Sequence, residues 1–380
     1  MATVNTAPAT PDGLNTDDPG IRQLAAAVSG TAPAQILLLH CGDLPGLEPG
    51  ATRLVLDVRE AEGSPQRCVS DVGAGLPEGV GPGSFELAAV WPRAHLGKDF
   101  SERCLGLGAL ALKPGGRLLC AVRKLKGGKS LGRTMKALFG DREVGVESRS
   151  RGYHLWVGRR GEDFDPDLAR ALCERTYLIE DPALGAVRLQ SRPGVFCRRE
   201  LDAGTRALIE VASERVPASA AGGARGEEPT RILDLCAGVG PLALWAAARW
   251  PEAQILAVES SARACALLRD NARDNGLDAQ VTALVHDGMP SPLAAGEAGA
   301  AGFLGATDLV LMNPPTHADP ETFERLLDLR AWLRPGGRAL VVVNRPARAV
   351  ELLTKLGASY EAIERAGYVV FQVGFGAGPT

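Results

Sequence analysis

The sequence lacks the residue patterns that bind metals or build a disulfide framework. None of its eight cysteines forms a Cys-x-x-Cys pair, and its five histidines show no ligand spacing. We therefore expect no metal site, and buried free thiols in a reducing cytoplasm rather than disulfides. No apolar run is long enough to span a membrane, and the N-terminus has no basic and apolar signal pattern, so we expect neither a membrane span nor an export signal.

The chain also lacks an excess of charge of either sign. Its formal net charge is −3 over 380 residues, so any contact with a nucleic acid has to come from a local basic patch. Hydrophobic residues make up 45% of the chain and charged residues 23%, which is ordinary for a soluble globular protein. The length suffices for two domains with cores of their own. Residues 1–18 are rich in Ala, Thr, Pro and Asp, which predicts a disordered tail.

The two halves of the chain repeat one order of elements. Apolar strands are expected at 35–39, 53–57, 85–92, 118–122 and 153–157, and again at 232–235, 255–258, 281–285, 308–315, 339–343 and 367–373. Helices are expected at 21–29, 101–112, 165–175, 205–213, 241–250 and 321–333, with a basic helix after residue 122. This alternation predicts an α/β fold with a parallel sheet in each half.

Three sequence matches in the same order indicate an internal duplication. Residues 85–95 align with 307–317 at a constant offset of 222, residues 113–117 with 334–338 at 221, and Arg-Gly-Tyr at 151–153 mirrors Ala-Gly-Tyr at 366–368. We expect a first domain over 19–160, a connecting segment over 161–213 and a second domain over 214–380.

The second half carries a glycine turn between a strand and a helix. Gly238 and Gly240 let the backbone approach a ligand closely, and the helix that begins at Pro241 would direct free N–H groups at it. Nineteen residues after Gly240 the next strand ends in Glu259, whose carboxylate can accept hydrogen bonds from a ribose diol. The turn also matches the dinucleotide fingerprint, so alone it does not separate a nicotinamide cofactor from S-adenosylmethionine, or either from a turn without a ligand.

Asn313, Pro314 and Pro315 follow a later strand, at the edge where open α/β sheets bind ligands. The Asn313 side-chain oxygen and the Pro314 carbonyl can accept hydrogen bonds from an amine, which would hold its lone pair toward an electrophilic methyl group. Asn-Pro is also common in plain turns. Because Glu259 and Asp287 stand at the ends of preceding strands, the pattern favours a site for methyl transfer.

The first half differs from the second at these positions. His-Cys-Gly at 40–42 replaces the glycine turn, and Trp-Pro-Arg at 91–93 replaces Asn-Pro-Pro. We therefore expect the first half to keep the fold and to have lost the site.

The motifs of the second half resemble the class I S-adenosylmethionine-dependent methyltransferases of the Asn-Pro-Pro type. The resemblance rests on Asp234–Gly240, Glu259, Asp287 and Asn313–His317. Together with the internal duplication, it implies two tandem Rossmann-like methyltransferase domains, of which the N-terminal one is degenerate.

Further segments narrow the resemblance. Pro193–Phe196, Leu201–Thr205, Ser130–Gly140 and Arg151–Tyr153 are similar to segments of the tandem-domain ribosomal RNA guanine-N2 methyltransferases of bacteria. The small-subunit enzyme is the better match, and the resemblance covers about residues 35–375.

The family implies roles by position. The residues around the cofactor, S-adenosyl-L-methionine, would be Asp234, Cys236, Gly238, Gly240, Glu259, Asp287 and Phe196. Glu259 would bind the ribose hydroxyls and Asp287 the adenine amine. Asn313, Pro314 and Pro315 would hold the guanine N2 amine, and Phe196 would cover the cofactor or the flipped base.

Two positions depart from the family. Cys236 stands where members have glycine, and Thr316 stands where members have an aromatic residue that stacks on the base. Loss of such stacking costs on the order of 1–3 kcal/mol per base, unless Phe196 or another ring replaces it. Thr316 and His317 are candidate substrate contacts, although an exposed turn histidine is the alternative for His317.

Residues 112–160 carry thirteen Lys and Arg against three acidic residues. We expect this segment to bind RNA phosphates, with a solvated basic helix face as the alternative. The candidate contacts are Arg123, Lys124, Lys126, Lys129 and Arg133, and the expected partner is ribosomal RNA or the 30S subunit.

The sequence thus predicts methyl transfer from S-adenosylmethionine to the exocyclic N2 of a guanine in 16S ribosomal RNA, by direct in-line displacement without a metal. Cys236 and Thr316 leave a non-catalytic RNA-binding relic as an alternative. A 23S ribosomal RNA guanine and a protein glutamine are alternative substrates. A nicotinamide oxidoreductase would have no use for Asn313 and its two prolines.

Overall fold

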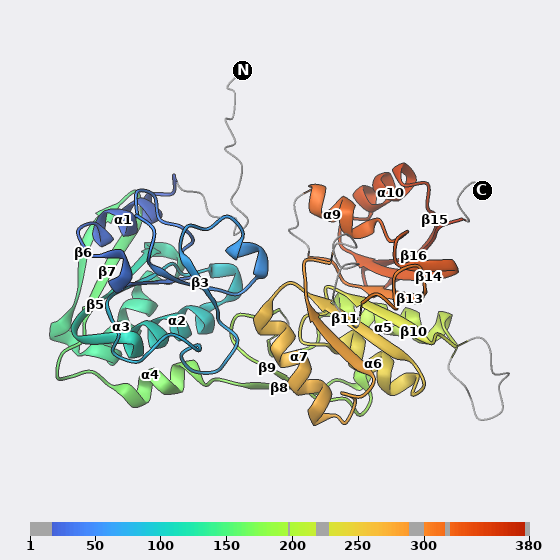
Figure 1. The fold of residues 1–380 in the computed structure, drawn as a ribbon, viewed down its shortest axis with the longest axis horizontal. Coiled ribbons are helices and arrows are strands. Elements are labelled where there is room, and N and C mark those ends of the chain that lie inside the picture. The colour runs from blue at the N-terminus through green and yellow to red at the C-terminus, as the bar shows by residue number, and fades with distance from the viewer. Residues whose placement is uncertain (1–16, 197, 218–227, 289–299, 316–319, 377–380) are drawn as a thin grey trace, which may run out of the picture. The chain divides into compact units, whose positions relative to one another are not determined.

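The computed structural model describes residues 17–196, 198–217, 228–288, 300–315 and 320–376. The chain divides into two compact units (Figure 1). The first comprises residues 1–176 with 192–194, and the second comprises 177–191 with 195–380. The predicted connecting segment, 161–213, is divided between them, and the predicted tail lies outside the described residues except for Asp17 and Asp18.

The first unit, blue to green in Figure 1, is built on a seven-stranded sheet in the order β3-β2-β1-β4-β5-β7-β6. Its strands are β1 Ile36–Leu39, β2 Thr52–Val55, β3 Arg67–Ser70, β4 Phe85–Val90, β5 Leu112–Arg123, β6 Val144–Ser150 and β7 Tyr153–Arg159. Its helices are α1 Pro19–Val28, α2 Lys98–Ala111, α3 Lys129–Phe139 and α4 Pro166–Cys173.

The second unit repeats this sheet in the order β12-β11-β10-β13-β14-β16-β15. Its strands are β10 Arg231–Leu235, β11 Gln254–Glu259, β12 Val281–Val285, β13 Thr307–Met312, β14 Leu333–Val343, β15 Ser359–Arg365 and β16 Tyr368–Gly374, with a separate pair, β8 Tyr177–Ile179 and β9 Leu189–Ser191. Its helices are α5 Ala203–Arg215, α6 Pro241–Arg249, α7 Ala262–Asp274, α9 Pro320–Leu327 and α10 Pro346–Lys355.

The central strands are mostly apolar because helices cover both faces of each sheet. Leu37 and Leu39 pack with α2, α3 and α4, whereas Ile36 and Leu38 point to the other face and pack with α1. In the second unit Ile232 packs with α5, α6 and α7, and Leu233 packs with α9 and α10. Side chains alternate between faces along a strand, so a strand covered on both sides has no polar face.

The backbone repeats as well. His40 and Cys236, each just after the first strand of its sheet, both have positive φ, 55° and 65°. Arg151 and Ala366, each followed by a glycine, turn the final hairpin of each sheet with φ of 43° and 49°. These backbone matches support the duplication, and the match of His40 with Cys236 lies at a turn where the residue types of the two halves differ.

The expectation of a parallel sheet is confirmed for five strands of each sheet and is wrong at one edge. β7 and β6 pair antiparallel to β5 and to each other, and β16 and β15 do the same beside β14. The sheets are therefore mixed. The outer strand β15 is largely exposed and carries charged residues, so it has no apolar run by which the sequence would reveal it.

The helix expected at 321–333 ends at Leu327. Asp328 pairs with Arg330 two residues later, at 2.6 Å, and the chain turns there into β14. No helix of the described part of the chain is long and apolar enough to cross a membrane.

Candidate functional site

The predicted site residues of the second unit lie at one edge of its sheet. β12, β11, β10, β13 and β14 are parallel neighbours in that order, so their carboxyl ends meet at the same edge. Asp234 and Glu259 lie at the ends of β10 and β11, while Asp287 and Asn313 follow β12 and β13. This edge is where parallel α/β sheets bind ligands.

The glycine turn is tied to the next strand through Glu259. The Gly238 amide donates to Glu259 Oε2 at 2.7 Å, and the Ser261 amide donates to Glu259 Oε1 at 2.7 Å. Gly238 and Gly240 both have positive φ, 57° and 95°, which a side chain would strain. The carboxylate is thereby fixed and half-buried at the end of β11.

Asp234 is fully buried below the turn. Its Oδ2 accepts from the Ala243 amide at 2.9 Å, whereas its Oδ1 has no hydrogen-bond partner among the described residues. Burial raises the pKa of this carboxyl to about 8, and the nearby Glu259 carboxylate adds to the rise. A Cβ placed on Gly238 would meet nothing within 4 Å, so the turn faces open space. A cationic ligand group bound at the open turn would stabilise the ionised form of this carboxyl, whose Oδ1 has no other partner among the described residues.

Cys236 lies in this turn in the left-handed region, half-buried. The φ of 65° explains why glycine suits this position, because a side chain there is strained. After β12, His286 Nδ1 lies 3.0 Å from Asp287 Oδ1, and both side chains are partly exposed.

Asn313 is clamped by two residues that the sequence analysis did not assign to the site. Its Nδ2 donates to Asp202 Oδ2 and to Thr205 Oγ1, both at 2.9 Å. Both amide hydrogens are thereby engaged, which fixes the orientation of the amide and leaves Oδ1 as an acceptor at the pocket.

The clamp belongs to the start of α5. Asp202 caps this helix by accepting from the Thr205 amide at 2.9 Å. Gly204 permits the arrangement, since a Cβ there would come within 3.0 Å of Asp202 Oδ2 and 3.3 Å of the Tyr368 ring. The Asp-x-Gly-Thr spacing was a signal in the sequence for a helix start, but nothing in it indicated a contact with Asn313.

A cavity of about 170 Å³ joins the predicted catalytic residues to further side chains. Its lining comprises Phe196, Asp202, Asn313, Pro314, Pro315, Phe323, Val342, Val343, Asn344, Arg345, Arg348 and Tyr368. Phe196 is 61% exposed although it is a large apolar ring. The structure therefore brings Phe196 together with Asn313, Pro314 and Pro315, and its role toward the cofactor stays a prediction.

Two predicted site residues are not described by the structure, and three residues that were not predicted line the pocket. Thr316 and His317 lie outside the described residues. Asn344, Arg345 and Arg348, which the sequence analysis did not single out, line the pocket from the segment after β14. The sequence contains no signal for a site here, because Asn-Arg-Pro indicates only the start of a helix.

The predicted RNA-binding residues lie in the first unit. Arg123, Lys124, Lys126, Lys129 and Arg133 are all exposed, from the end of β5 into α3. Leu125, between two of the lysines, is 94% exposed. Burial lowers the pKa of His154, and the charges of Arg149 and Lys124 lower it further, so several cations gather here.

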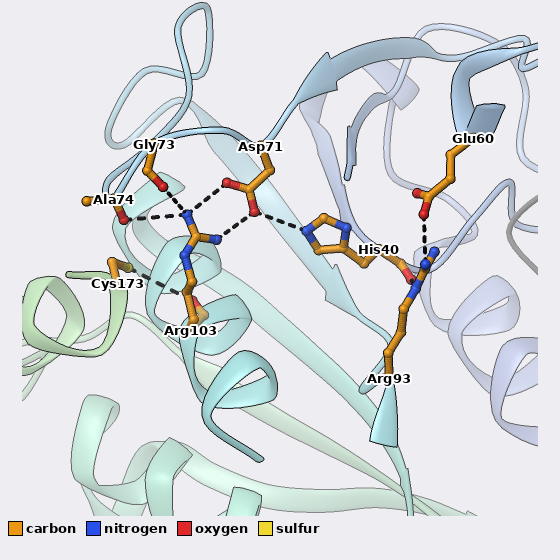
Figure 2. A network of polar contacts seen from close by, with 8 residues as sticks. All are labelled: His40, Glu60, Asp71, Gly73, Ala74, Arg93, Arg103 and Cys173. Carbon is orange, nitrogen blue, oxygen red and sulfur yellow. Dashed lines mark hydrogen bonds and ion pairs between the residues drawn. The ribbon is translucent and has the colours of Figure 1, made fainter. Parts of the chain in front are cut away.

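At the corresponding edge of the first unit, buried ion pairs occupy the strand ends (Figure 2). The Arg103 guanidinium forms a two-pronged pair with Asp71, at 2.6 and 2.8 Å, and also donates to the Gly73 carbonyl at 2.9 Å. The side chains of Arg103 and Asp71 have no exposed surface.

His40 links this pair to a second one. Its Nε2 lies 3.2 Å from Asp71 Oδ2, and its carbonyl accepts from Arg93 Nε at 3.2 Å. Arg93 in turn pairs with Glu60 at 2.7 Å. Burial lowers the pKa of His40, so the imidazole is neutral at physiological pH and the two arginines balance the two carboxylates.

Comparison with known proteins identifies the family. A ribosomal RNA small subunit methyltransferase C of Chromohalobacter salexigens is 32% identical over 265 residues, which cover 67% of this chain and 67% of the relative. The chain belongs to the ribosomal RNA small subunit methyltransferase C family. Residues 186–372 match the family model of the methyltransferase small domain, and this range contains every predicted catalytic and cofactor-binding residue. The family predicted from the sequence is thereby confirmed.

A solved structure supports the fold of this family. The T. thermophilus 16S rRNA N2 methyltransferase, determined in complex with AdoMet and guanosine, matches with a TM-score of 0.73 at 24% identity, covering 94% of this chain and 91% of that chain. The likeness confirms two tandem Rossmann-like methyltransferase domains. The chain spans about half the length of some other relatives, such as the small subunit methyltransferase C of Pasteurella multocida, which is 29% identical over 47% of this chain and 48% of its own.

Proposed function

We propose that the chain transfers a methyl group from S-adenosylmethionine to the exocyclic N2 amine of a guanine in 16S ribosomal RNA. The orientation of Asn313 carries this proposal. Asp202 and Thr205 engage both amide hydrogens, so the Asn313 oxygen is presented to the pocket as an acceptor. A guanine N2 amine has two hydrogens to donate, and Asn313 and the Pro314 carbonyl supply two acceptors for them.

The residues at the ends of β10, β11 and β12 fit S-adenosylmethionine. The unpartnered oxygen of Asp234 and the open space at Gly238 suit the cationic methionine end. Glu259, fixed by the Gly238 and Ser261 amides, would bind the ribose hydroxyls, and Asp287 would accept from the adenine amine. When bound, this cofactor supplies an electrophilic methyl group.

The chain's own residues orient the amine and stabilise its charge. The exocyclic amine of a base is a weak nucleophile, and two acceptors would hold its lone pair toward the methyl group and stabilise the positive charge that develops. Pro314 and Pro315 have no N–H to compete for these acceptors. The methylated nitrogen is acidic and gives its proton to water, so no strong base is required. Phe196 would stack on the guanine face, because position 316 has threonine instead of an aromatic residue.

The first unit is proposed to bind RNA and not the cofactor. In the first unit, buried ion pairs that involve Asp71 and Glu60 lie at the sheet edge that corresponds to the glycine turn of the second unit. The exposed cations from Arg123 to Arg133 would supply charge for binding ribosomal RNA phosphates. A protein that modifies ribosomal RNA would work beside ribosomes in the cytoplasm.

The test is methyl transfer from labelled S-adenosylmethionine to 30S subunits and to naked 16S RNA from a strain that lacks the endogenous enzyme. We expect label on a single guanine, and a loss of at least about a hundredfold in kcat for Asn313→Ala with cofactor affinity retained. No label with the cofactor still bound would indicate another substrate. No label and no cofactor binding would indicate an RNA-binding relic.

A further inference from the structure

Two arginines line the pocket that holds Asn313. Arg345 is exposed and precedes the first residue of α10, and Arg348 follows in the first turn of this helix. The Arg348 guanidinium lies 5.7 Å from the centre of the Phe323 ring. Neither arginine forms an ion pair with any residue that the structure describes.

Several other arginines at the surface of this unit are held in ion pairs. Arg206, Arg330 and Arg365 each have a carboxylate partner at 2.6 Å. The pocket lining contains one carboxylate, Asp202, and that group is already engaged by Asn313 and by the cap of α5. Two positive charges at this pocket therefore lack a counter-charge within the described part of the chain.

Guanidinium groups match the geometry of phosphate, to which they donate in pairs. A base that leaves its stack to enter a pocket brings its own phosphates to the rim. The amide of a glutamine side chain, the alternative substrate, carries no charge and has no use for two cations. The positions of Arg345 and Arg348 thus favour a nucleotide.

We propose that Arg345 and Arg348 bind the phosphates that flank the target guanine, so that the pocket takes a nucleotide of an RNA strand. The inference rests on the proposed function and assigns to it residues that no motif marks. Such contacts position the strand and carry no sequence information, so they act on substrate affinity more than on the chemical step.

The experiment compares the full-length double variant R345A/R348A with a matched control, R273A/R330A, which removes two exposed arginines of the same unit that do not line the pocket. KM and kcat for 30S subunits are measured at several salt concentrations, and the cofactor dissociation constant is measured by calorimetry. We expect KM to rise at least about tenfold in R345A/R348A alone. The slope of log KM against log salt should fall by about one to two units, with cofactor affinity unchanged.

The outcomes separate this inference from the function on which it rests. If 30S subunits are methylated, Asn313→Ala abolishes the label and R345A/R348A behaves like the control, the phosphate contacts are refuted and the methyltransferase proposal stands. If the wild type labels no RNA but labels a glutamine-containing peptide, both are refuted. A raised KM and a reduced salt slope, confined to R345A/R348A, support the inference.

Discussion

At the scale of the single residue, the acceptor that Asn313 offers depends on a hydroxyl 108 positions earlier in the chain. Thr205→Val keeps the shape of the buried side chain but removes the acceptor for one amide hydrogen. The amide can then rotate and present a donor to the pocket. A lost hydrogen bond of about 1–3 kcal/mol predicts a fall in kcat of about tenfold or more.

Three measurements distinguish a role of Thr205 in positioning Asn313 from a role in folding. Thr205→Val should leave the cofactor dissociation constant and the unfolding midpoint near their wild-type values, and Thr205→Ser, which retains the hydroxyl, should restore kcat. Thr354→Val, which removes an exposed threonine hydroxyl on α10, is the control. An unchanged kcat in Thr205→Val would contradict the clamp.

Asp234 makes the stability of the second unit depend on pH. Its carboxyl keeps a proton up to a pH of about 8 in the folded chain, whereas the ordinary value is 3.8. Between these values the folded state binds more protons than the unfolded state, so the free energy of unfolding falls as pH rises. Asp234→Asn lacks this dependence. Its stability relative to the wild type should improve from pH 5.5 to pH 8, by a few kcal/mol at most.

Urea unfolding of wild type and Asp234→Asn at the two pH values, without cofactor, checks this prediction. The same substitution should weaken binding of S-adenosylmethionine, because the oxygen that suits its ammonium group is replaced or rotated. Parallel pH profiles for the two proteins would show that Asp234 is ionised in the folded state.

At the scale of elements, the buried pairs of the first unit hold the ends of its strands together. Arg103→Met would leave Asp71 as a buried charge without its strongest partner, and loss of one partner of a buried pair costs about 3–5 kcal/mol. We expect a drop of this size in the stability of the first unit, measured by urea unfolding. Cofactor affinity below the unfolding transition should not change, because the predicted cofactor residues belong to the second unit.

The matched variant is Arg103→Met combined with Asp71→Asn, which removes the unpaired charge. It should be more stable than Arg103→Met alone, since the two residues share one interaction. If the double variant is less stable than the single one, the pair is not the source of the stability.

The elements and site residues that could be predicted from the sequence are those that a single local pattern identifies. The glycine turn and Asn313 stand directly after apolar strands, so their place at the ligand-binding edge follows from strand direction alone. The antiparallel edge was missed because β15 is exposed and has no apolar run. The clamp on Asn313 was missed for a different reason: its contact with Asp202 bridges 111 positions, and only the fold brings those residues together.

At the scale of the whole molecule, duplication gives two sheets whose ligand-binding edges have different contents. In the second unit, the edge has a glycine turn, an orphaned carboxylate and a cavity. In the first, arginines and carboxylates neutralise each other in the same place. Because the net charge of the chain is −3, it can bind a polyanion only through a local positive surface. The exposed cations that follow β5 form such a surface.

If the first unit binds RNA and the second unit transfers the methyl group, neutralising those cations should weaken RNA binding and leave the rate of methyl transfer on bound RNA unchanged. The triple variant Lys124→Gln, Lys126→Gln and Lys129→Gln removes three exposed charges, and none of the three lysines forms an ion pair with a described residue. Affinity for 16S RNA should fall at least about tenfold at 0.15 M salt, and the slope of log affinity against log salt should lose about two to three units. The control replaces Arg170, Arg188 and Arg273 by Gln, since each is exposed and already paired with a neighbouring carboxylate. Equal affinities and equal salt slopes in the two triple variants would place the RNA-binding surface elsewhere on the molecule.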